Sequence, residues 1–382
     1  MYKGVGIFKA RGDIKLNMTM PLGPDEERIA VLASHLIRFE TTTPERVNAC
    51  ADYCADWLEQ GGLSVNVYEH QGLKSVVASV GSGLPVIVLN GHLDVVPGES
   101  ADFSPRMENG RLYGRGSYDM LGAVASMMVL MAELAKDVPD CTVKLALVPD
   151  EESGGERGTG YLVERGEIGD IAICGEPTNL NIALQAKGIL QLVVEAAGVA
   201  AHGSRPWLGK NAILEALRHY EKIASMRFFE ESTSYFDRPS LNLAKIQAGT
   251  VFNQVPDRCT VGVDIRYLPG QKADDLLRMI REALPDAEIK VHFHGYPVDT
   301  KAEHKLVRRL QACAGTSFFG QDGSADTRFY ARQGIPAVEF GPAGANHHGP
   351  GEYADIPSLG RYKQILKQFI KQAKDDMHEI QG

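Results

Sequence analysis

The sequence contains no apolar run long enough to span a membrane, which takes about 20 residues. It contains no block of Lys and Arg, and its formal net charge is −9 at pH 7. Nucleic acids and anionic membrane surfaces attract basic patches, so neither is expected as the main partner. The sequence also lacks internal repeats and low-complexity segments. These absences argue against the membrane, nucleic-acid-binding and repeat classes of protein.

Cysteine is scarce and scattered in this chain. The six cysteines form no CxxC pair, so a zinc site built from thiolates is not expected. Reduced core thiols in a cytoplasmic protein are the better interpretation. The N-terminal segment lacks the apolar core and the small-residue cleavage site of a secretory signal. We expect residues 1–23 to be an unstructured or tag-like extension, or an early start ahead of Met18 or Met20.

The length and composition of the chain favour two domains. Its 382 residues are long for a single hydrophobic core. A hydrophobic content of 44% and a charged content of 23% are typical of a soluble globular protein. The pattern of residues 24–182 changes over residues 183–295 and resumes over residues 296–382. The sequence therefore predicts a domain formed by the two outer segments, with the middle segment inserted as a second domain.

The most informative stretch of the first segment is residues 86–98. It begins with branched apolar residues and is bounded by glycine and proline, which predicts a strand buried on both faces of a mostly parallel sheet. His92 and Asp94 follow where the apolar run stops, and two residues apart in extended chain they project to the same side. Ligands of such sheets bind at the carboxyl ends of the strands. The pair suits a metal ligand and the carboxylate that orients it, although a solvated strand end has the same pattern.

Two further predicted strands also end in acidic residues. Glu151 and Glu152 follow residues 142–148, and Glu176 follows residues 170–174. The two glutamates are adjacent and can point in different directions, so one could bind a metal while the other holds a water. Several acids converging on one edge of one sheet are hard to explain as solvation alone.

Asp119 stands at the start of a predicted buried helix, residues 121–134. An ionised carboxylate in that position either caps the helix or points into a site. From this segment alone, capping is the commoner role. The acidic strand ends on either side of it in the sequence favour a site.

The middle segment predicts a compact α+β unit of the ferredoxin-like type. Two strands, a helix, two strands, a helix and a strand follow one another, which gives a sheet with its helices on one face. Its polar landmarks are His202, Asn253 and Arg266.

Taken together, these blocks resemble the M20 metallopeptidase family, which includes acetylornithine deacetylase, succinyl-diaminopimelate desuccinylase, aminoacylase and carboxypeptidase G-type enzymes. The resemblance covers the chain from about residue 24 to its end, and its eight blocks occur in the order of the family. They are GHLDVVPG, GRGSYDMLG, PDEESGG, GEPTN, AHGSRPWLGKNAI, NQVPDRC, DIRYLPG and HGPGEY.

The resemblance implies an α/β zinc-hydrolase domain that holds two zinc ions, for which cobalt or manganese can substitute. Asp119 would bridge the two metals. His92 and Glu176 would complete one metal site, and Glu152 with a C-terminal histidine would complete the other. Asp94 would orient His92, and Glu151 would be the general base.

The C-terminal metal ligand is either His347 or His348. The family usually places three residues between this ligand and the next glutamate, which favours His348 over its neighbour. The resemblance gives His202 the task of reaching the active site of a partner subunit and steadying the oxyanion, although a hydrogen-bonded loop histidine is the alternative.

Three residues resemble the positions that bind the substrate. Arg266 and Asn253 would bind its carboxylate, a task for which the planar guanidinium is suited. Their alternatives are an ordinary salt bridge and a turn asparagine. Arg328 lies in a segment that resembles the family's loop near the substrate.

The leading hypothesis is therefore a cytoplasmic two-zinc amidohydrolase that cleaves an N-acyl amino acid. The partners expected are a small-molecule N-acyl amino acid or short peptide and a second copy of the chain, joined through the inserted domain. The GEPT block and the carboxylate-binding candidates favour the deacylase branch of the family. A dipeptidase or carboxypeptidase with the same metal chemistry is the alternative enzyme. An inactive metal-bearing binding protein is the alternative of another class, but it predicts the loss of the base or of a ligand, and every such position is filled.

Overall fold

The computed structural model describes residues 16–17 and 22–374 of the chain. Most of the predicted N-terminal extension lies outside the described residues. The chain packs as two compact units: unit 1 contains the chain up to Leu180, Ala312–Ala314 and the chain from Phe340, and unit 2 contains Asn181–Gln311 and Gly315–Glu339. The predicted insert, residues 183–295, falls within unit 2, and its role as a separate domain stays a prediction.

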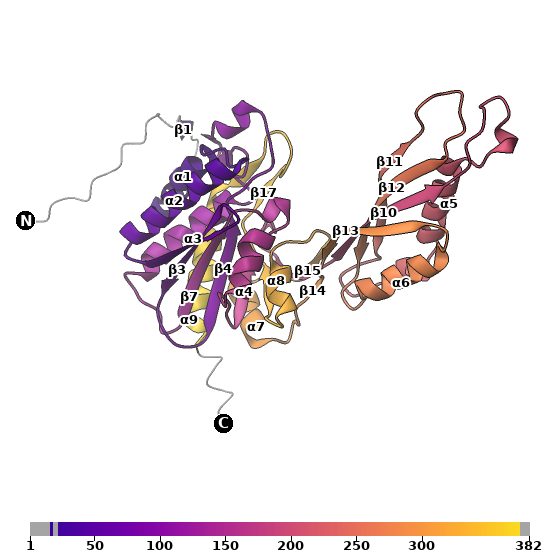
Figure 1. Cartoon of the computed structure of the whole chain (residues 1–382). Helices are drawn as coiled ribbons and strands as arrows, with labels where there is room; N and C mark the ends of the chain where they lie inside the picture. Colours follow the sequence, from indigo (N-terminus) through magenta and orange to yellow (C-terminus); the bar gives the residue numbers. More distant parts are fainter. Residues whose placement is uncertain (1–15, 18–21, 375–382) are drawn as a thin grey trace, which may run out of the picture. The chain divides into compact units, whose positions relative to one another are not determined.

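The core of unit 1 is a sheet whose central strands are parallel (Figure 1). β4 (Val86–His92) pairs in parallel with β7 (Thr142–Val148) on one side and with β8 (Ile171–Cys174) on the other. β3 (Leu73–Val80) and β2 (Ser64–His70) continue the sheet beyond β7 in antiparallel pairs. The carboxyl ends of β4, β7 and β8 therefore meet at one edge, as the apolar runs of the sequence predict.

Helices of unit 1 pack on this sheet and on one another. α3 (Leu121–Leu134) is buried at every position except Glu133, which is why its sequence is apolar all round. It packs against β4 and β7 and against α1 (Pro24–Ile37) and α9 (Ile356–Gln372). α2 (Pro44–Gln60) packs against β2 and β3. α3 thus forms the centre of the unit and begins two residues after Asp119.

A second, smaller sheet of unit 1 has short strands. Its order is β1 (Leu16–Asn17), β5 (Arg106–Glu108), β6 (Arg111–Tyr113), β18 (Tyr353–Asp355) and β17 (Gly344–Ala345). The antiparallel pairing of β6 with β18 joins the chain before α3 to the chain after residue 350. These strands were not predicted from the sequence, because two or three residues are too few to show a period.

Unit 2 contains a four-stranded antiparallel sheet. Its order is β11 (Ser240–Ala248), β12 (Arg258–Tyr267), β10 (Gly188–Ala197) and β13 (Glu288–Gly295). Alternate residues of β10 and β12 face α5 (Ala212–Ala224) and α6 (Ala273–Ala283). The inner residues form one core with the apolar stripes of the two helices: Leu190, Leu192, Val194, Val261, Val263, Ile265, Ala216, Ile223, Leu276 and Ile280.

Other elements of unit 2 and its borders are short. β9 (Ile182–Ala186) pairs with β14 (Val298–Asp299), β15 (Phe318–Gln321) and β16 (Ala337–Glu339). The remaining helices are α4 (Tyr161–Glu164) in unit 1, α7 (Lys305–Ala314) and α8 (Thr327–Arg332).

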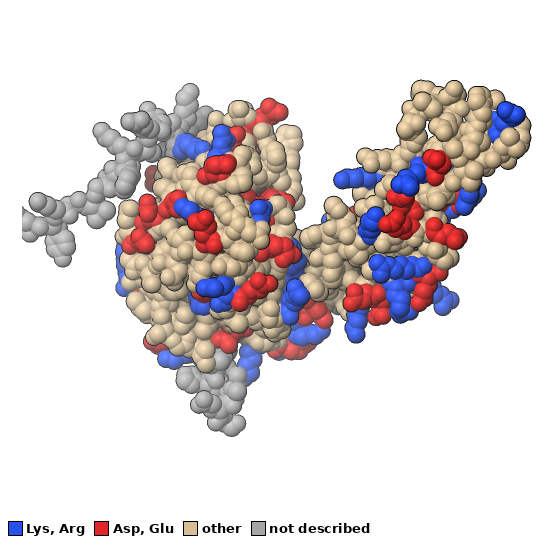
Figure 2. Space-filling model, in the orientation of Figure 1, with Lys and Arg blue, Asp and Glu red and all other residues tan. Residues whose placement is uncertain are grey.

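The predicted fold class is confirmed: the protein is mixed α/β, with a central sheet that is parallel at its middle and a separate antiparallel sheet. None of the helices in the described ranges is both long and apolar enough to cross a membrane. Acidic and basic side chains are interspersed on the face drawn in Figure 2.

Candidate metal centre

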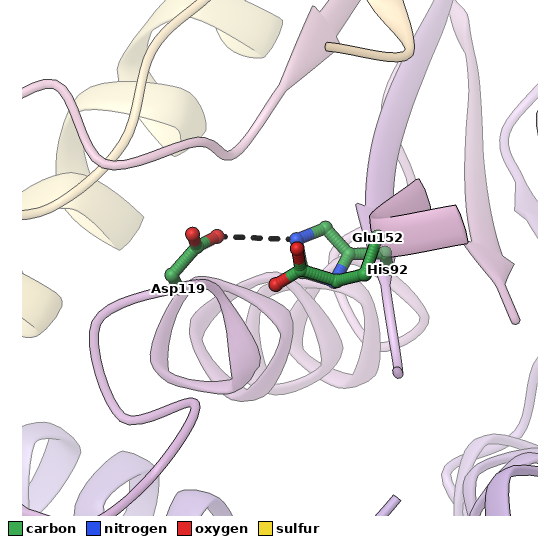
Figure 3. Close-up of side chains that lie close together, drawn as sticks. All are labelled: His92, Asp119 and Glu152. Atoms are coloured by element: carbon green, nitrogen blue, oxygen red, sulfur yellow. Dashed lines mark hydrogen bonds and ion pairs between the residues drawn. The ribbon is translucent and has the colours of Figure 1, made fainter. Parts of the chain in front are cut away.

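Three residues from different elements place ligand atoms within 4.8 Å of one another: His92, Asp119 and Glu152. His92 is the last residue of β4, Asp119 precedes α3, and Glu152 lies on the turn after β7. The Nε2 atom of His92 lies 3.1 Å from Oδ1 of Asp119, as the dashed line in Figure 3 shows. Two strand ends of the sheet and the start of α3 thus bring an imidazole and two carboxylates close together.

His348 joins this cluster from the loop between β17 and β18. Its Nε2 atom lies 3.0 Å from Oδ2 of Asp119 and 3.0 Å from Oε1 of Glu152. His347 packs instead against the Tyr118 ring, with 6.0 Å between the ring centres. Of the two adjacent histidines, the structure brings His348 to the carboxylates, and the choice of ligand between them stays a prediction.

Glu176 lies on the other side of His92. It follows β8, is 8% exposed, and places Oε2 at 4.0 Å from Nε2 of His92. Glu176, which follows β8, therefore approaches His92, whereas Glu152, which follows β7, pairs with His348. Both imidazoles also contact Asp119.

Asp94 lies closer to His92 through its main chain than through its carboxylate, and its task of orienting His92 stays a prediction. Nδ1 of His92 donates a hydrogen bond to the main-chain oxygen of Asp94 at 2.8 Å. The carboxylate Oδ1 of Asp94 is 3.7 Å from the same nitrogen. The carboxylate accepts the backbone N–H of Glu151 at 3.1 Å and that of Glu152 at 3.0 Å. Asp94 thus fixes the tautomer of His92 through its backbone and the turn of the two glutamates through its side chain.

The electrostatics of the cluster couple the two histidines to Asp119. Burial alone would raise the pKa of Asp119, but hydrogen bonds with His348 and His92 outweigh it and hold that pKa well below its usual range. Hydrogen bonds with Asp119 and Glu152 raise the pKa of His348 to about 10. Burial lowers the pKa of His92, but Asp119 and the charge of Glu176 outweigh it and raise that pKa well above its usual value. Burial raises the pKa of Asp94 to about 7.

The donor set fits divalent metal ions. Within the described part of the chain, Asp119 and Glu152 pair with histidines and with no Lys or Arg. Carboxylates and imidazoles are hard or borderline ligands that suit zinc, cobalt and manganese. Several buried carboxylates gather here, and a bound divalent cation would supply positive charge that offsets their burial.

Two acidic residues that border the cluster, Glu352 and Asp150, were not singled out from the sequence. Glu352 is 3% exposed, and its Oε2 accepts a hydrogen bond from Nη1 of Arg115 at 2.8 Å. Its Oε1 accepts the backbone N–H groups of Tyr118 and Asp119, both at 3.1 Å. In the sequence, Glu352 was used only to measure the spacing that favours His348. Its place as the glutamate of the HGPGEY block was the signal that could have identified it.

Asp150 was missed in a similar way. It lies directly before Glu151, is 2% exposed, and its Oδ2 accepts the backbone N–H of Arg157 at 2.9 Å. Its main-chain oxygen accepts N–H groups from Ser153 and Gly155, which closes the turn that carries both glutamates. The turn ends at Gly154, whose positive φ of 116° glycine adopts without steric cost.

His202 and Asn253 lie together on neighbouring loops of unit 2. Their segments form a bridge between His202 and Gln254, and the main-chain oxygen of Asn253 accepts the N–H of Gly203 at 2.7 Å. The backbone N–H of Ser204 donates to Nδ1 of His202 at 3.2 Å. Because Nδ1 accepts, the neutral ring carries its proton on Nε2, and the exposed ring can donate from that atom.

Arg266 and Arg328 have partners within unit 2. Arg266, on β12, donates from Nε to Oδ1 of Asp264 at 2.7 Å. Arg328 is 4% exposed, donates to the main-chain oxygen of Ala325 at 3.1 Å, and lies over the Phe329 ring. The assignment of both arginines to the substrate stays a prediction.

Comparison with known proteins identifies the family. The sequence pattern of peptidase family M20/M25/M40 matches residues 88–372. The succinyl-diaminopimelate desuccinylase of Thioalkalivibrio sulfidiphilus is 30% identical over 371 residues, which cover 89% of this chain and 98% of that protein. The chain therefore belongs to the M20 family.

Solved structures share its fold. An M20 family metallo-carboxypeptidase from Sulfolobus solfataricus superposes with a TM-score of 0.77 at 19% identity, over 92% of this chain and 99% of that one. A Bacillus subtilis protein described as a dinuclear metal binding peptidase of the M20 family superposes with a TM-score of 0.67 at 16% identity, over 91% and 98% of the chains. The resemblance to this family is confirmed, and the protein is a hydrolase of a class that cleaves amide bonds with metal ions.

Proposed function

We propose that this protein hydrolyses the amide bond of an N-acyl amino acid, with N-succinyl-diaminopimelate as the first candidate substrate. The observation that carries the proposal is the cluster of His92, Asp119, Glu152 and His348, with Glu151 beside it on the same turn. The candidate substrate comes from relatives about 30% identical that are named succinyl-diaminopimelate desuccinylase.

The proposed cofactor is a pair of zinc ions, with cobalt or manganese as substitutes. The two oxygens of Asp119 face different histidines: Oδ1 faces His92 and Oδ2 faces His348. This arrangement supports Asp119 as the ligand shared by both metals. His92 and Glu176 would then complete one site, and Glu152 and His348 the other.

Such metals, when bound, polarise an amide carbonyl and lower the pKa of a bound water. Glu151 is the proposed general base, which takes the proton of the attacking water and delivers it to the leaving amine. Asp94 holds the backbone of Glu151 in place for this task. The products are a carboxylate and a free amino acid.

Unit 2 supplies the proposed substrate contacts. His202 donates a hydrogen bond from Nε2 to the developing oxyanion in a partner subunit's site, which its Nδ1 contact with Ser204 supports. Asn253 lies on the adjacent loop and is proposed to bind the substrate carboxylate with Arg266. Asp264 accepts hydrogen bonds from both Nε and Nη2 of Arg266, so the substrate carboxylate would use Nη1 and the remaining N–H of Nη2. Arg328 is the third proposed contact.

A homodimer formed through unit 2 is part of the proposal. β11 stands at one edge of its sheet, and Ile246 on that strand is 48% exposed. Leu214 and Leu217 on α5 are 52% and 38% exposed. Exposed apolar side chains beside a strand edge favour association with a second copy. The cytoplasm is the proposed location, because the six cysteines are all free thiols.

The experiment that tests this function is amine release by the zinc- or cobalt-loaded protein. The panel contains N-acetyl and N-succinyl amino acids, including ornithine and diaminopimelate derivatives, beside dipeptides. Turnover confined to N-acyl compounds supports the deacylase, and turnover of dipeptides alone assigns the protein to the peptidase branch. No turnover with two metals bound would favour the binding-protein alternative.

A further inference from the structure

Arg115 and Glu352 form a buried ion pair beside the metal cluster. Their side chains are 5% and 2% exposed, and Nη1 of Arg115 lies 2.8 Å from Oε2 of Glu352. Neither residue belongs to the proposed ligands or to the proposed base. Removing two charges from water is costly unless their geometry and remaining hydrogen bonds are good, so the pair calls for a physical account.

The second oxygen of Glu352 holds the loop that carries Asp119. Oε1 accepts the backbone N–H groups of Tyr118 and Asp119, both at 3.1 Å. Two consecutive amides are therefore fixed by one carboxylate oxygen just before α3 begins. The Asp119 side chain starts from a backbone that Glu352 holds in place.

The same pair also holds the loop that carries His348. Glu352 is four residues after His348, and its main-chain oxygen accepts the N–H of Gly114 at 3.0 Å. Nη1 of Arg115 also donates to the main-chain oxygen of Gly349 at 3.3 Å. Because β18 begins at the next residue and pairs with β6, the position of Glu352 itself is fixed by the small sheet.

We propose that Glu352, paired with Arg115, is a positioning residue that sets the separation between the carboxylate of Asp119 and the imidazole of His348. The inference rests on the proposed function, because it takes these two side chains as metal ligands. Residues that orient metal ligands in this way typically change metal affinity about 10–100-fold when they are replaced. Glu352 is thus expected to control metal affinity without touching the metal or the substrate.

Two variants test the role of the carboxylate. Glu352→Gln keeps one oxygen for the amides of Tyr118 and Asp119 but turns an NH₂ group toward Arg115, which removes the charge-assisted hydrogen bond. Glu352→Asp keeps the charge but shortens the side chain by one methylene, so it cannot reach both loops at their present separation.

Glu133→Gln is the matched control. Glu133 is a partly buried carboxylate of unit 1, paired with Lys363 and Lys367, and it lies at the opposite end of α3. That is roughly 20 Å from Asp119 along a helix that rises about 1.5 Å per residue. A general loss of stability should also appear in Glu133→Gln, whereas a change in Co²⁺ affinity should not.

The measurements are Co²⁺ affinity by competition with a chelator, the visible absorption of the Co²⁺ form, and circular dichroism of the metal-free protein. We expect both Glu352 variants to fold without metal, to bind Co²⁺ about 10–100-fold more weakly, and to give an altered absorption spectrum. The control should match the wild type in affinity and spectrum and differ only in its melting temperature.

Wild-type Co²⁺ affinity and spectrum in a folded Glu352 variant would overturn the inference. Failure of both variants to fold would also overturn it, because the pair would then serve the fold and not the ligands. If the wild type itself binds no Co²⁺, the proposed function fails first, so the two failures are distinguishable.

Discussion

The carboxylate of Asp94 accepts the backbone N–H of Glu151 at 3.1 Å. Asp94 follows β4 and Glu151 follows β7, so this hydrogen bond links the ends of two parallel strands. The other oxygen of Asp94 accepts the N–H of Glu152 at 3.0 Å. One buried carboxylate therefore positions both the proposed base and a proposed ligand.

Replacing Asp94 is expected to affect catalysis more than folding. Asp94→Asn puts an NH₂ group against one of the two N–H donors, and we expect turnover to fall about 10–100-fold, in the range seen when residues that orient metal ligands are changed. Steady-state kinetics on the metal-loaded variant provide the measurement. Turnover equal to that of the wild type would show that Asp94 does not position the turn that carries Glu151 and Glu152.

Glu151→Gln is expected to keep the fold and the bound metal while turnover falls about 10²–10⁴-fold, the usual contribution of a general base. Metal content and turnover are measured on the same sample. Glu156→Gln, an exposed glutamate at the start of the next helical turn, is the control and should keep normal activity. Normal activity of the Glu151 variant would exclude Glu151 as the base.

The adjacent histidines allow a direct comparison of two neighbouring positions. His348→Ala removes the imidazole that lies 3.0 Å from both Asp119 and Glu152, so one of two bound metals should be lost on dialysis. His347→Ala removes a ring that packs against Tyr118 and should leave two metals bound. Metal content by atomic emission distinguishes them. The reverse pattern would assign the ligand to His347.

The buried ion pairs of Lys363 are expected to contribute strongly to the stability of unit 1. The Lys363 side chain is fully buried on α9 and pairs with Asp25 of α1 and Glu133 of α3. Lys363→Met leaves these carboxylates without their shared cation and is expected to lower the free energy of unfolding by about 3 kcal/mol. Lys371→Met breaks an exposed pair with Asp137 and should cost less than about 1 kcal/mol. Urea denaturation measures both, and equal losses would contradict this account.

The effect of Lys363 should depend on pH. Its hydrogen bond lowers the pKa of Asp25, and for Glu133 the hydrogen bonds from Lys363 and Lys367 outweigh burial and lower that pKa as well. A pKa that is lower in the folded state gives stability above the unfolded value of about 4, and that stability is lost as the pH falls through the folded value. The stability difference between wild type and Lys363→Met should therefore shrink below about pH 4. A difference that stays constant in acid would argue against the charge as its source.

Much of unit 1 could be predicted from the sequence, because its elements are long and apolar. The bounds predicted for α3 and β7 match the structure, since the run from Leu121 and the run from Thr142 mark them clearly. The convergence of His92, Glu152 and Glu176 followed from parallel strands that end at one edge.

Other contacts could not be predicted, because they depend on pairings far apart in the sequence. The link between Glu352 and Arg115 spans 237 residues and depends on a three-residue strand, β18, that shows no local period. Burial of Lys363 depends on three helices meeting, which a lysine in an amphipathic pattern does not reveal. The use of Asp94's backbone in place of its carboxylate toward His92 is a matter of rotamer and turn geometry.

The measurement that tests the central claim most directly is turnover of N-succinyl-diaminopimelate by the metal-free protein during titration with Zn²⁺. The proposed function predicts no turnover without metal, and succinate and free diaminopimelate released as up to two Zn²⁺ per chain are bound. Hydrolysis by the metal-free protein, or two bound Zn²⁺ per chain with no hydrolysis of this or any other N-acyl amino acid, would contradict it.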